Sequence, residues 1–321
     1  MEKYLKYSLI LLTLLFAGLT GVAILTNALE TIVKANIFFL AASSILFLVS
    51  IMFWIIPWAL LIKKNSKFSM LSAIVLGFSC VYGALTPVQV GAEALRAIKA
   101  KDILKVSYSE SISAAMVVKG IKFFLLGLLS SGVLLLILVE TELSPIMLFG
   151  LLSGFVVIAL ASALFLLPMS KRMGDLISDI FSKIAKVIPI FKVLEKYFRN
   201  YSAYLKKISL GTLIAVFLMA SASFALEFTA LLFAFFALGV NIDIIPLTVL
   251  FVIISILERT PVLPRGLGLV EAAGFIFLSI PDFALVLLTT SQIGAILVLF
   301  DVVRLVVPTL FSLAVSLIKL K

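Results

Sequence analysis

The chain has 321 residues, of which 63% are apolar and 13% charged, and its mean hydropathy is +1.29. Soluble domains are about 45–50% apolar and about 25% charged, so this composition excludes a soluble enzyme, a disordered protein and a nucleic-acid-binding domain. Histidine is absent and Cys80 is the single cysteine, which excludes an internal disulfide, a Cys/His zinc site and histidine-centred catalysis. The net charge of +10 therefore indicates orientation in a membrane and contact with anionic lipid.

The first apolar run, 8–26, is uncharged and follows a basic start that contains Lys3 and Lys6. The run is longer than the apolar core of a signal peptide, and no small-residue cleavage site follows it. We therefore expect a first transmembrane helix whose N-terminus is cytoplasmic.

Further apolar runs approach or exceed the length of about 20 residues that crosses a bilayer. They are 37–62, 111–139, 144–168, 208–238, 283–300 and 303–318. Two other stretches, 69–105 and 244–280, are interrupted by proline, glycine and charge, so their apolar pieces are too short to span alone. We expect each to form a re-entrant helical hairpin, because broken helices are tolerated at membrane depth only where protein or water covers the freed backbone.

Loop charges agree with this arrangement. Basic clusters flank 69–105, and both lie inside if this stretch enters and returns, as the positive-inside rule favours. The segment 171–207 holds nine basic and three acidic residues, and its apolar periodicity predicts two amphipathic helices on the inner membrane surface. We interpret it as an interfacial linker, with a regulatory or lipid-recruiting role as the alternative. Under the same scheme Lys319 and Lys321 fall outside, against the rule.

The linker separates two halves, 1–170 and 208–321, each with a span, a broken pair and then two spans. The second half starts inside and the matching helix of the first starts outside, so the halves are expected to be inverted. We therefore predict an all-α polytopic membrane protein with about seven full transmembrane helices, two re-entrant hairpins and an inverted-repeat architecture. In such proteins, short interrupted segments at matching places indicate the substrate site.

The two breaks have similar sequences, TPVQVGAEALR over 86–96 and TPVLPRGLGLVEA over 260–272. Proline ends the incoming helix and glycine allows a tight turn. The N-terminus of the returning helix, together with Arg96 or Arg265, suits a phosphate. The structural alternative is that these residues only break and cap helices.

Acidic and basic residues elsewhere in the apolar runs are further candidates, because each is costly in lipid. Glu227 lies deep in a predicted span and requires a partner such as Lys119, Lys122 or Arg304, or else is protonated within the bundle. Asp301 and Arg304 are one turn apart and are expected to pair. For Lys119 and Lys122 the alternative is snorkelling to the phosphates of the inner leaflet.

The patterns T-P-x-x-x-G-x-E-x-x-R at 86–96 and P-R-G-L-G-x-x-E at 264–271 resemble two motifs of a known family. This is the lysylphosphatidylglycerol synthase transmembrane-region, or flippase-like, family, which includes the membrane half of the multiple peptide resistance factor. The resemblance covers essentially the whole chain and implies a polytopic lipid translocase with the motif residues near the headgroup path. Arg265 stands where the family usually has glycine.

Combining the two breaks, their charges and the resemblance gives one set of predicted substrate-binding residues. These are Thr86, Pro87, Gly91, Glu93, Arg96, Glu227, Arg259, Arg265, Gly266, Gly268 and Glu271. Further candidates are Lys119, Lys122, Asp301 and Arg304. Glu93 and Glu271 are expected to cap a helix, pair with arginine, or accept a substrate amine or a proton. No catalytic residue, metal or cofactor is expected.

We predict a translocase that moves an anionic phospholipid or a polyprenyl-phosphate-type lipid between leaflets and is not an enzyme. No G-x-x-x-x-G-K-[ST] motif is present, so transport is expected to follow a gradient or to be coupled to an ion. The alternatives are an intramembrane lipid-linked transferase and a non-transporting membrane partner of a separate synthase. The expected partners are the anionic lipid and the bilayer, with no nucleic acid. A separate lipid-modifying enzyme and a second copy of the chain are open options, and the expected location is the plasma membrane.

Overall fold

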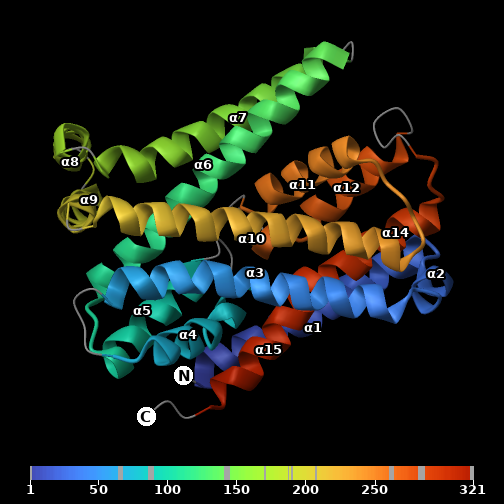
Figure 1. Cartoon of the computed structure of the whole chain (residues 1–321), viewed down its shortest axis with the longest axis horizontal. Helices are drawn as coiled ribbons and strands as arrows, with labels where there is room; N and C mark the ends of the chain where they lie inside the picture. The colour runs from blue at the N-terminus through green and yellow to red at the C-terminus, as the bar shows by residue number, and fades with distance from the viewer. Residues whose placement is uncertain are drawn as a thin grey trace. The chain divides into compact units, whose positions relative to one another are not determined.

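A computed structural model of the chain describes residues 2–63, 68–85, 90–140, 145–169, 171–186, 188, 191–206, 208–259, 264–280 and 286–318. Every regular element within these residues is helical (Figure 1). The predicted all-α class is therefore confirmed.

The described helices form two compact units that interleave along the chain. Unit 1 consists of Met1–Phe53, Gly77–Leu95 and Ala222–Lys319, and unit 2 of Trp54–Leu76 and Arg96–Ser221. The boundaries fall inside four helices, which are α3 (Ile37–Lys63), α4 (Met70–Phe78), α5 (Val90–Leu104) and α10 (Leu210–Ala237). The predicted halves 1–170 and 208–321 divide the chain differently and stay a prediction.

A proline lies beside the boundary in α3. Pro57 has no N–H to donate to the carbonyl of Phe53 four residues earlier, so the helix lacks one hydrogen bond there. Phe53 ends the unit 1 part of α3 and Trp54 begins the unit 2 part.

Unit 1 is built mainly from the two ends of the chain. Its remaining elements are α1 (Glu2–Leu25), α2 (Leu29–Val33), η1 (Val81–Leu85), α11 (Ile244–Glu258), η4 (Pro264–Gly266), α12 (Leu269–Ser279), α14 (Thr290–Asp301), η5 (Val302–Val306) and α15 (Val307–Ser316). Helix α1 packs on α14 and η1. Leu12, Leu15 and Leu19 recur at helical spacing and are buried with Ala295 and Leu305 in one apolar cluster.

The last helices differ from the prediction. The sequence predicted two spans, 283–300 and 303–318, but α14, η5 and α15 form one uninterrupted helical run from Thr290 to Ser316. The segment between the two predicted spans contains no proline or glycine, and η5 continues the helix as a π-helix. The charges that suggested a boundary, Asp301 and Arg304, are both buried. If the rest of the topology predicted from the loop charges holds, one crossing fewer would put Lys319 and Lys321 on the same side as 171–207, as the positive-inside rule favours; this placement stays a prediction.

Both interrupted stretches fold back on themselves in their described parts. In the first, a Cβ atom placed on Gly83 of η1 would lie 2.8 Å from the carbonyl carbon of Gly91 and 2.9 Å from the backbone nitrogen of Ala92. In the second, α11 and α12 pack against each other. That each stretch enters and leaves the same face of a bilayer stays a prediction.

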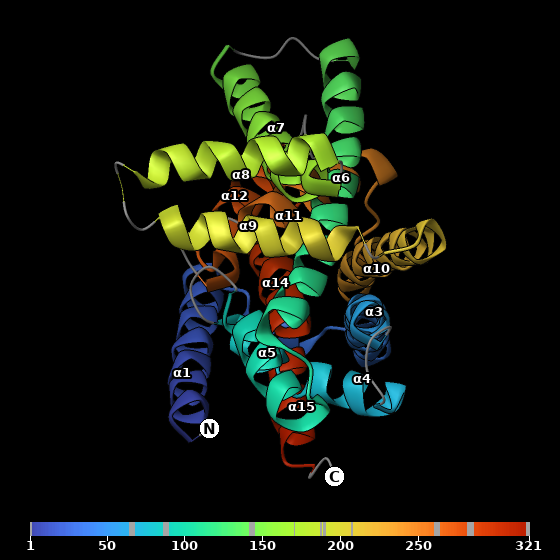
Figure 2. The same ribbon diagram turned by 90° about the vertical axis from the view of Figure 1, so that its left-hand side faces the viewer.

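Unit 2 contains a long helical pair and the linker. Its remaining elements are α6 (Tyr108–Glu140), α7 (Pro145–Leu166), η3 (Leu167–Met169), α8 (Lys171–Ala185) and α9 (Phe191–Leu205). Helices α6 and α7 pack along each other (Figure 1), and α8 and α9 lie side by side (Figure 2). The rings of Phe181 and Phe198 stack at 4.8 Å between α8 and α9, while Leu176 and Ile180 are exposed. Two helices in the linker are thus confirmed.

Four described helical runs are long and apolar enough to cross a membrane. They are Ile37–Lys63, Tyr108–Leu135, Leu210–Ala237 and Thr290–Ser316. Shorter apolar helices cover Leu12–Leu25, Met70–Leu85, Ile244–Glu258 and Leu269–Ser279. The protein is therefore a multi-pass membrane protein, and the predicted number of seven full spans stays a prediction.

Candidate functional site

In unit 2, two buried cationic side chains, Arg96 and Lys122, both lie near the ring of Trp54. The guanidinium carbon of Arg96, on α5, lies 5.1 Å from the ring centre of Trp58 and 5.8 Å from that of Trp54. The amine of Lys122, on α6, lies 4.8 Å from the Trp54 ring centre. Arg96 is 2% exposed and Lys122 is 5% exposed. We call these four residues the cation–indole cluster.

Local sequence explains how the cluster forms. Trp54 and Trp58 are four residues apart on α3, so they lie on one face of the helix. The indole N–H of Trp58 donates to the carbonyl oxygen of Ser111 on α6 at 3.2 Å, which ties α3 to the helix that carries Lys122. Each cation–π contact contributes about 0.5–2 kcal/mol, depending on how far it is desolvated.

Trp58 is fully buried, and Trp58→Ala is expected to lower the free energy of unfolding by about 3–5 kcal/mol through the cavity it leaves. Trp58→Phe keeps an aromatic ring but removes the indole hydrogen bond to the Ser111 carbonyl, so we expect a smaller loss of about 0.5–1.5 kcal/mol. Thermal unfolding in detergent, followed by the emission of Trp54, measures both. Leu135→Ala on α6, where the side chain is exposed, is the control and should change stability by about 0.5 kcal/mol or less. An equal loss in Trp58→Ala and Leu135→Ala would contradict the prediction.

Unit 1 contains a separate buried ion network around Arg304 in η5. Its Nε donates to Oδ1 of Asp301 at 2.5 Å, and its Nη2 donates to Oε1 of Glu271 at 3.2 Å. Nη1 of Arg304 donates to the carbonyl oxygen of Arg265 at 3.1 Å. The predicted pairing of Asp301 with Arg304 is confirmed, and the structure adds Glu271 from α12.

Arg265 occupies the turn between α11 and α12 in a left-handed conformation, with φ of 49°. This conformation is natural for glycine and costly for other residues. Its side chain forms an ion pair with Glu258 at the end of α11, where Nε donates to Oε1 at 2.7 Å. Its Nη1 also donates to the carbonyl oxygen of Arg304 at 2.8 Å. In the structure, the side chain of Arg265 therefore joins η4 to α11 and η5.

Glu271 has two partners that the sequence had offered as alternatives. Its Oε2 accepts the backbone N–H of Gly268 and so caps α12, and its Oε1 accepts from Arg304. Gly266 and Gly268 have φ of +69° and +83°, a backbone conformation that glycine adopts without the strain a Cβ would add. The N-terminus of α12 thus has a carboxylate of its own chain beside it.

Two other candidate residues of unit 1, Arg259 and Glu227, contact residues outside the Arg304 network. Arg259 follows α11, donates through Nη1 to the carbonyl oxygen of Ser255 at 2.6 Å, and lies 5.5 Å from the centre of the Phe224 ring. Glu227, on α10, is half-buried and accepts a hydrogen bond from Ser223 at 3.2 Å.

The first break is described only in part. Glu93 is buried on α5, and Gly91 is the second residue of the same helix, which begins at Val90. Lys119 is half-buried on α6, one turn before Lys122. Thr86 and Pro87 lie outside the described residues.

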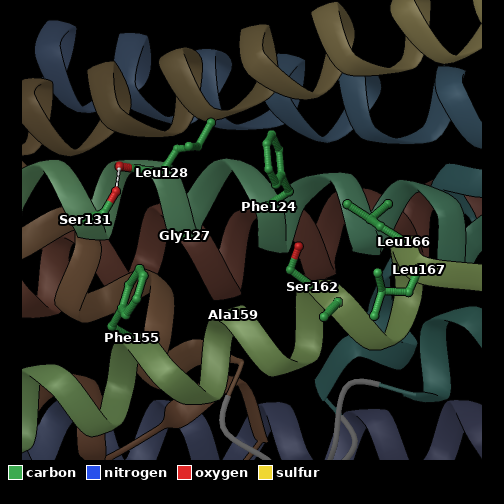
Figure 3. Close-up of a pocket in the computed structure, with 10 residues that line it drawn as sticks. Phe124, Gly127, Leu128, Ser131, Phe155, Ala159, Ser162, Leu166 and Leu167 are labelled. Atoms are coloured by element: carbon green, nitrogen blue, oxygen red, sulfur yellow. Dashed lines mark hydrogen bonds between the residues drawn. The ribbon is translucent and has the colours of Figure 1, made fainter. Parts of the chain in front are cut away.

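Unit 2 also has an apolar cavity of about 580 Å³ between α6 and α7 (Figure 3). Its wall includes Phe124 and Leu128 from α6 and Phe155 and Leu166 from α7. None of the residues that line it is charged. The cavity therefore suits a hydrocarbon chain rather than a charged headgroup.

Sequence reasoning missed Trp54, Trp58 and Glu258. The two tryptophans had a signal, because the chain has only these two and they are one helical turn apart near a charged segment. Glu258 precedes Arg259 and was read only as the end of an apolar run. Its pairing with Arg265 depends on the turn between them, which hydropathy does not reveal.

The family model described as lysylphosphatidylglycerol synthase TM region matches residues 5–312. The chain belongs to this family. No curated protein and no solved structure gave a significant match. Membership in this membrane-lipid family confirms the resemblance inferred from the two motifs, and the ion network of unit 1 includes residues of the second motif.

Proposed function

We propose that this protein moves an anionic lipid, of phospholipid or polyprenyl-phosphate type, between the leaflets of a membrane and carries out no covalent step. The observation that carries the proposal is the cation–indole cluster of unit 2. It holds Arg96 and Lys122 beside the same indole in a chain whose long helices suit a bilayer. The negative face of an indole attracts a cation, so Trp54 holds the two cationic groups near each other.

A phosphate group complements this cluster. The guanidinium of Arg96 can donate two parallel hydrogen bonds to phosphate oxygens, and the Lys122 amine adds a point charge. A lipid that presents its phosphate to the cluster can leave its chains in apolar surroundings such as the cavity between α6 and α7. We propose the plasma membrane as the location, with the N-terminus inside.

The test is lipid movement in sealed proteoliposomes. Fluorescent phosphatidylglycerol and a polyprenyl phosphate are the anionic probes, and phosphatidylcholine is the zwitterionic control. Arg96→Gln is expected to slow exchange of the anionic probes at least about tenfold, which corresponds to about 1.4 kcal/mol. Lys101→Gln is the matched control, because Lys101 also makes a cation–π contact, 4.4 Å from the Tyr108 ring centre, but is exposed. It should exchange lipid at the wild-type rate.

Binding can be measured without transport, because Trp54 and Trp58 are the only tryptophans of the chain. Titration of the detergent-solubilised protein with anionic lipid is expected to change their emission, and phosphatidylcholine should not. A folded wild-type protein that exchanges no anionic lipid would overturn the proposal. If in addition a new lipid product formed in detergent, the protein would be a transferase.

A further inference from the structure

Unit 1 holds a buried group of charges that the proposed phosphate site does not use. Arg304, Asp301 and Glu271, here called the Arg304 triad, are 0%, 1% and 7% exposed. The arginine donates to both carboxyl groups, at 2.5 Å to Asp301 and 3.2 Å to Glu271. One guanidinium between two ionised carboxylates leaves a buried net charge of −1, which is costly in a low-dielectric interior.

Among the side chains that the structure describes, the carboxyl groups of the triad form salt bridges with Arg304 and with no second cation. The elements packed around it carry several charged or titratable groups. These are Glu258 and Arg259 on and after α11, Arg265 in η4, Glu30 and Lys34 on and after α2, Cys80 and Tyr82 at η1, and Glu2, Lys3, Tyr4, Lys6 and Tyr7 at the start of α1. Arg265 pairs with Glu258, and Arg259 contacts the Ser255 carbonyl and the Phe224 ring. Glu30 and Lys34 are exposed.

A second observation indicates what neutralises the triad. Oδ2 of Asp301 is buried and accepts no hydrogen bond from any donor in the described part of the chain. The carboxyl groups of Asp301 and Glu271 both contact the guanidinium of Arg304, so the two acids lie against the same cation. A proton on one of two such carboxyl groups removes the net charge and gives the pair a donor that the described residues do not supply.

We propose that the Arg304 triad is a proton-binding site that holds one proton on the Asp301–Glu271 pair, and that this proton crosses the membrane with the lipid. The coupling rests on the proposed translocase function, whereas the proton site itself does not. A headgroup with one negative charge and one proton cross together without net charge. The lipid therefore accumulates in the leaflet that faces the more alkaline compartment.

The coupling test uses proteoliposomes with fluorescent phosphatidylglycerol and a pH step of one unit, with the membrane potential held at zero. Wild type is expected to enrich the probe in the alkaline-side leaflet by up to about tenfold. Asp301→Asn fixes the triad in its neutral form, so it should exchange the probe without any enrichment. Asp243→Asn removes an exposed carboxylate of the same unit and is expected to behave as wild type.

A second readout separates the proton site from transport. Infrared difference spectra of the detergent-solubilised protein between acid and alkaline pH should contain a protonated-carboxyl band that Asp301→Asn or Glu271→Gln removes and Asp243→Asn retains. Fast exchange of the lipid probe by wild type without enrichment under the pH step would overturn the proton coupling but not the translocase function. Absence of the infrared band in wild type would overturn the proton site, and absence of all exchange with the band present would overturn the translocase alone.

Discussion

Arg304→Gln is expected to lower the free energy of unfolding by about 3–5 kcal/mol, because it leaves the carboxyl groups of Asp301 and Glu271 buried without their shared cation. The side chain is fully buried, so water cannot replace the lost donors. Cys80 is the single cysteine and is buried in unit 1. Its reaction with a thiol-reactive dye during heating in detergent therefore reports the unfolding of this unit.

The control for Arg304 is an exposed arginine with a single carboxylate partner. Arg199 pairs with Glu195 at 2.7 Å on α9, but its side chain is 70% exposed, so Arg199→Gln should cost at most about 1 kcal/mol. Tryptophan emission follows unit 2 in the same samples. The double variant Arg304→Gln with Asp301→Asn should lose less than the sum of the two single variants, because it removes one of the orphaned charges. If Arg304→Gln and Arg199→Gln lowered the free energy of unfolding equally, the ion network around Arg304 would not stabilise unit 1.

Gly266→Ala is expected to have the second large effect, a loss of about 2–5 kcal/mol from two separate costs. The residue has φ of +69°, where an alanine is strained by about 1–2 kcal/mol. The added Cβ would also lie 2.6 Å from the carbonyl oxygen of Leu257 and 3.0 Å from the backbone nitrogen of Glu258. These are backbone atoms of α11 and can move only with the helix, so overpacking adds about 1–3 kcal/mol.

Gly239 is the control that separates the conformational cost of an alanine at positive φ from the steric cost of its Cβ. It follows α10 in the same unit and has φ of +67°, but a Cβ placed there would meet nothing within 4 Å. Gly239→Ala should therefore show only the conformational cost. Cys80 reactivity measures both variants on one scale, and the difference between them is the steric term. If the two variants melt together, the close approach of η4 to α11 does not constrain the turn.

Much of the helical framework could be predicted from the sequence. Long apolar runs are a local property, and the predicted spans 37–62, 111–139 and 208–238 correspond to α3, α6 and α10. The linker helices α8 and α9 also follow from local periodicity. The predicted end of one span at position 300 and start of the next at 303 was wrong. A charged residue in an apolar run, such as Asp301, resembles the end of a membrane span unless its partner is known.

For the candidate site, too, contacts between residues close in the sequence could be predicted, and contacts made by tertiary packing could not. The pairing of Asp301 with Arg304 is local, three residues along one helix, and was predicted. Glu271 is 33 residues from Arg304 and reaches it through the packing of α12 on α14. Trp54 meets Arg96 across α3 and α5, a contact that no spacing rule contains. Tertiary packing therefore decided which of the charges meet.

Pro308, the second residue of α15, gives the Arg265 contact a further meaning. A proline has no N–H for the carbonyl four residues earlier, which here is that of Arg304. That carbonyl instead accepts a hydrogen bond from the guanidinium of Arg265. The side chain of Arg265 thus supplies a donor to a helix from which a proline has removed one. The side chain at position 265 and the backbone donor at position 308 are therefore interchangeable sources of one hydrogen bond: a variant with glycine at 265 would lose this donor, and a residue other than proline at 308 would offer a backbone N–H in its place.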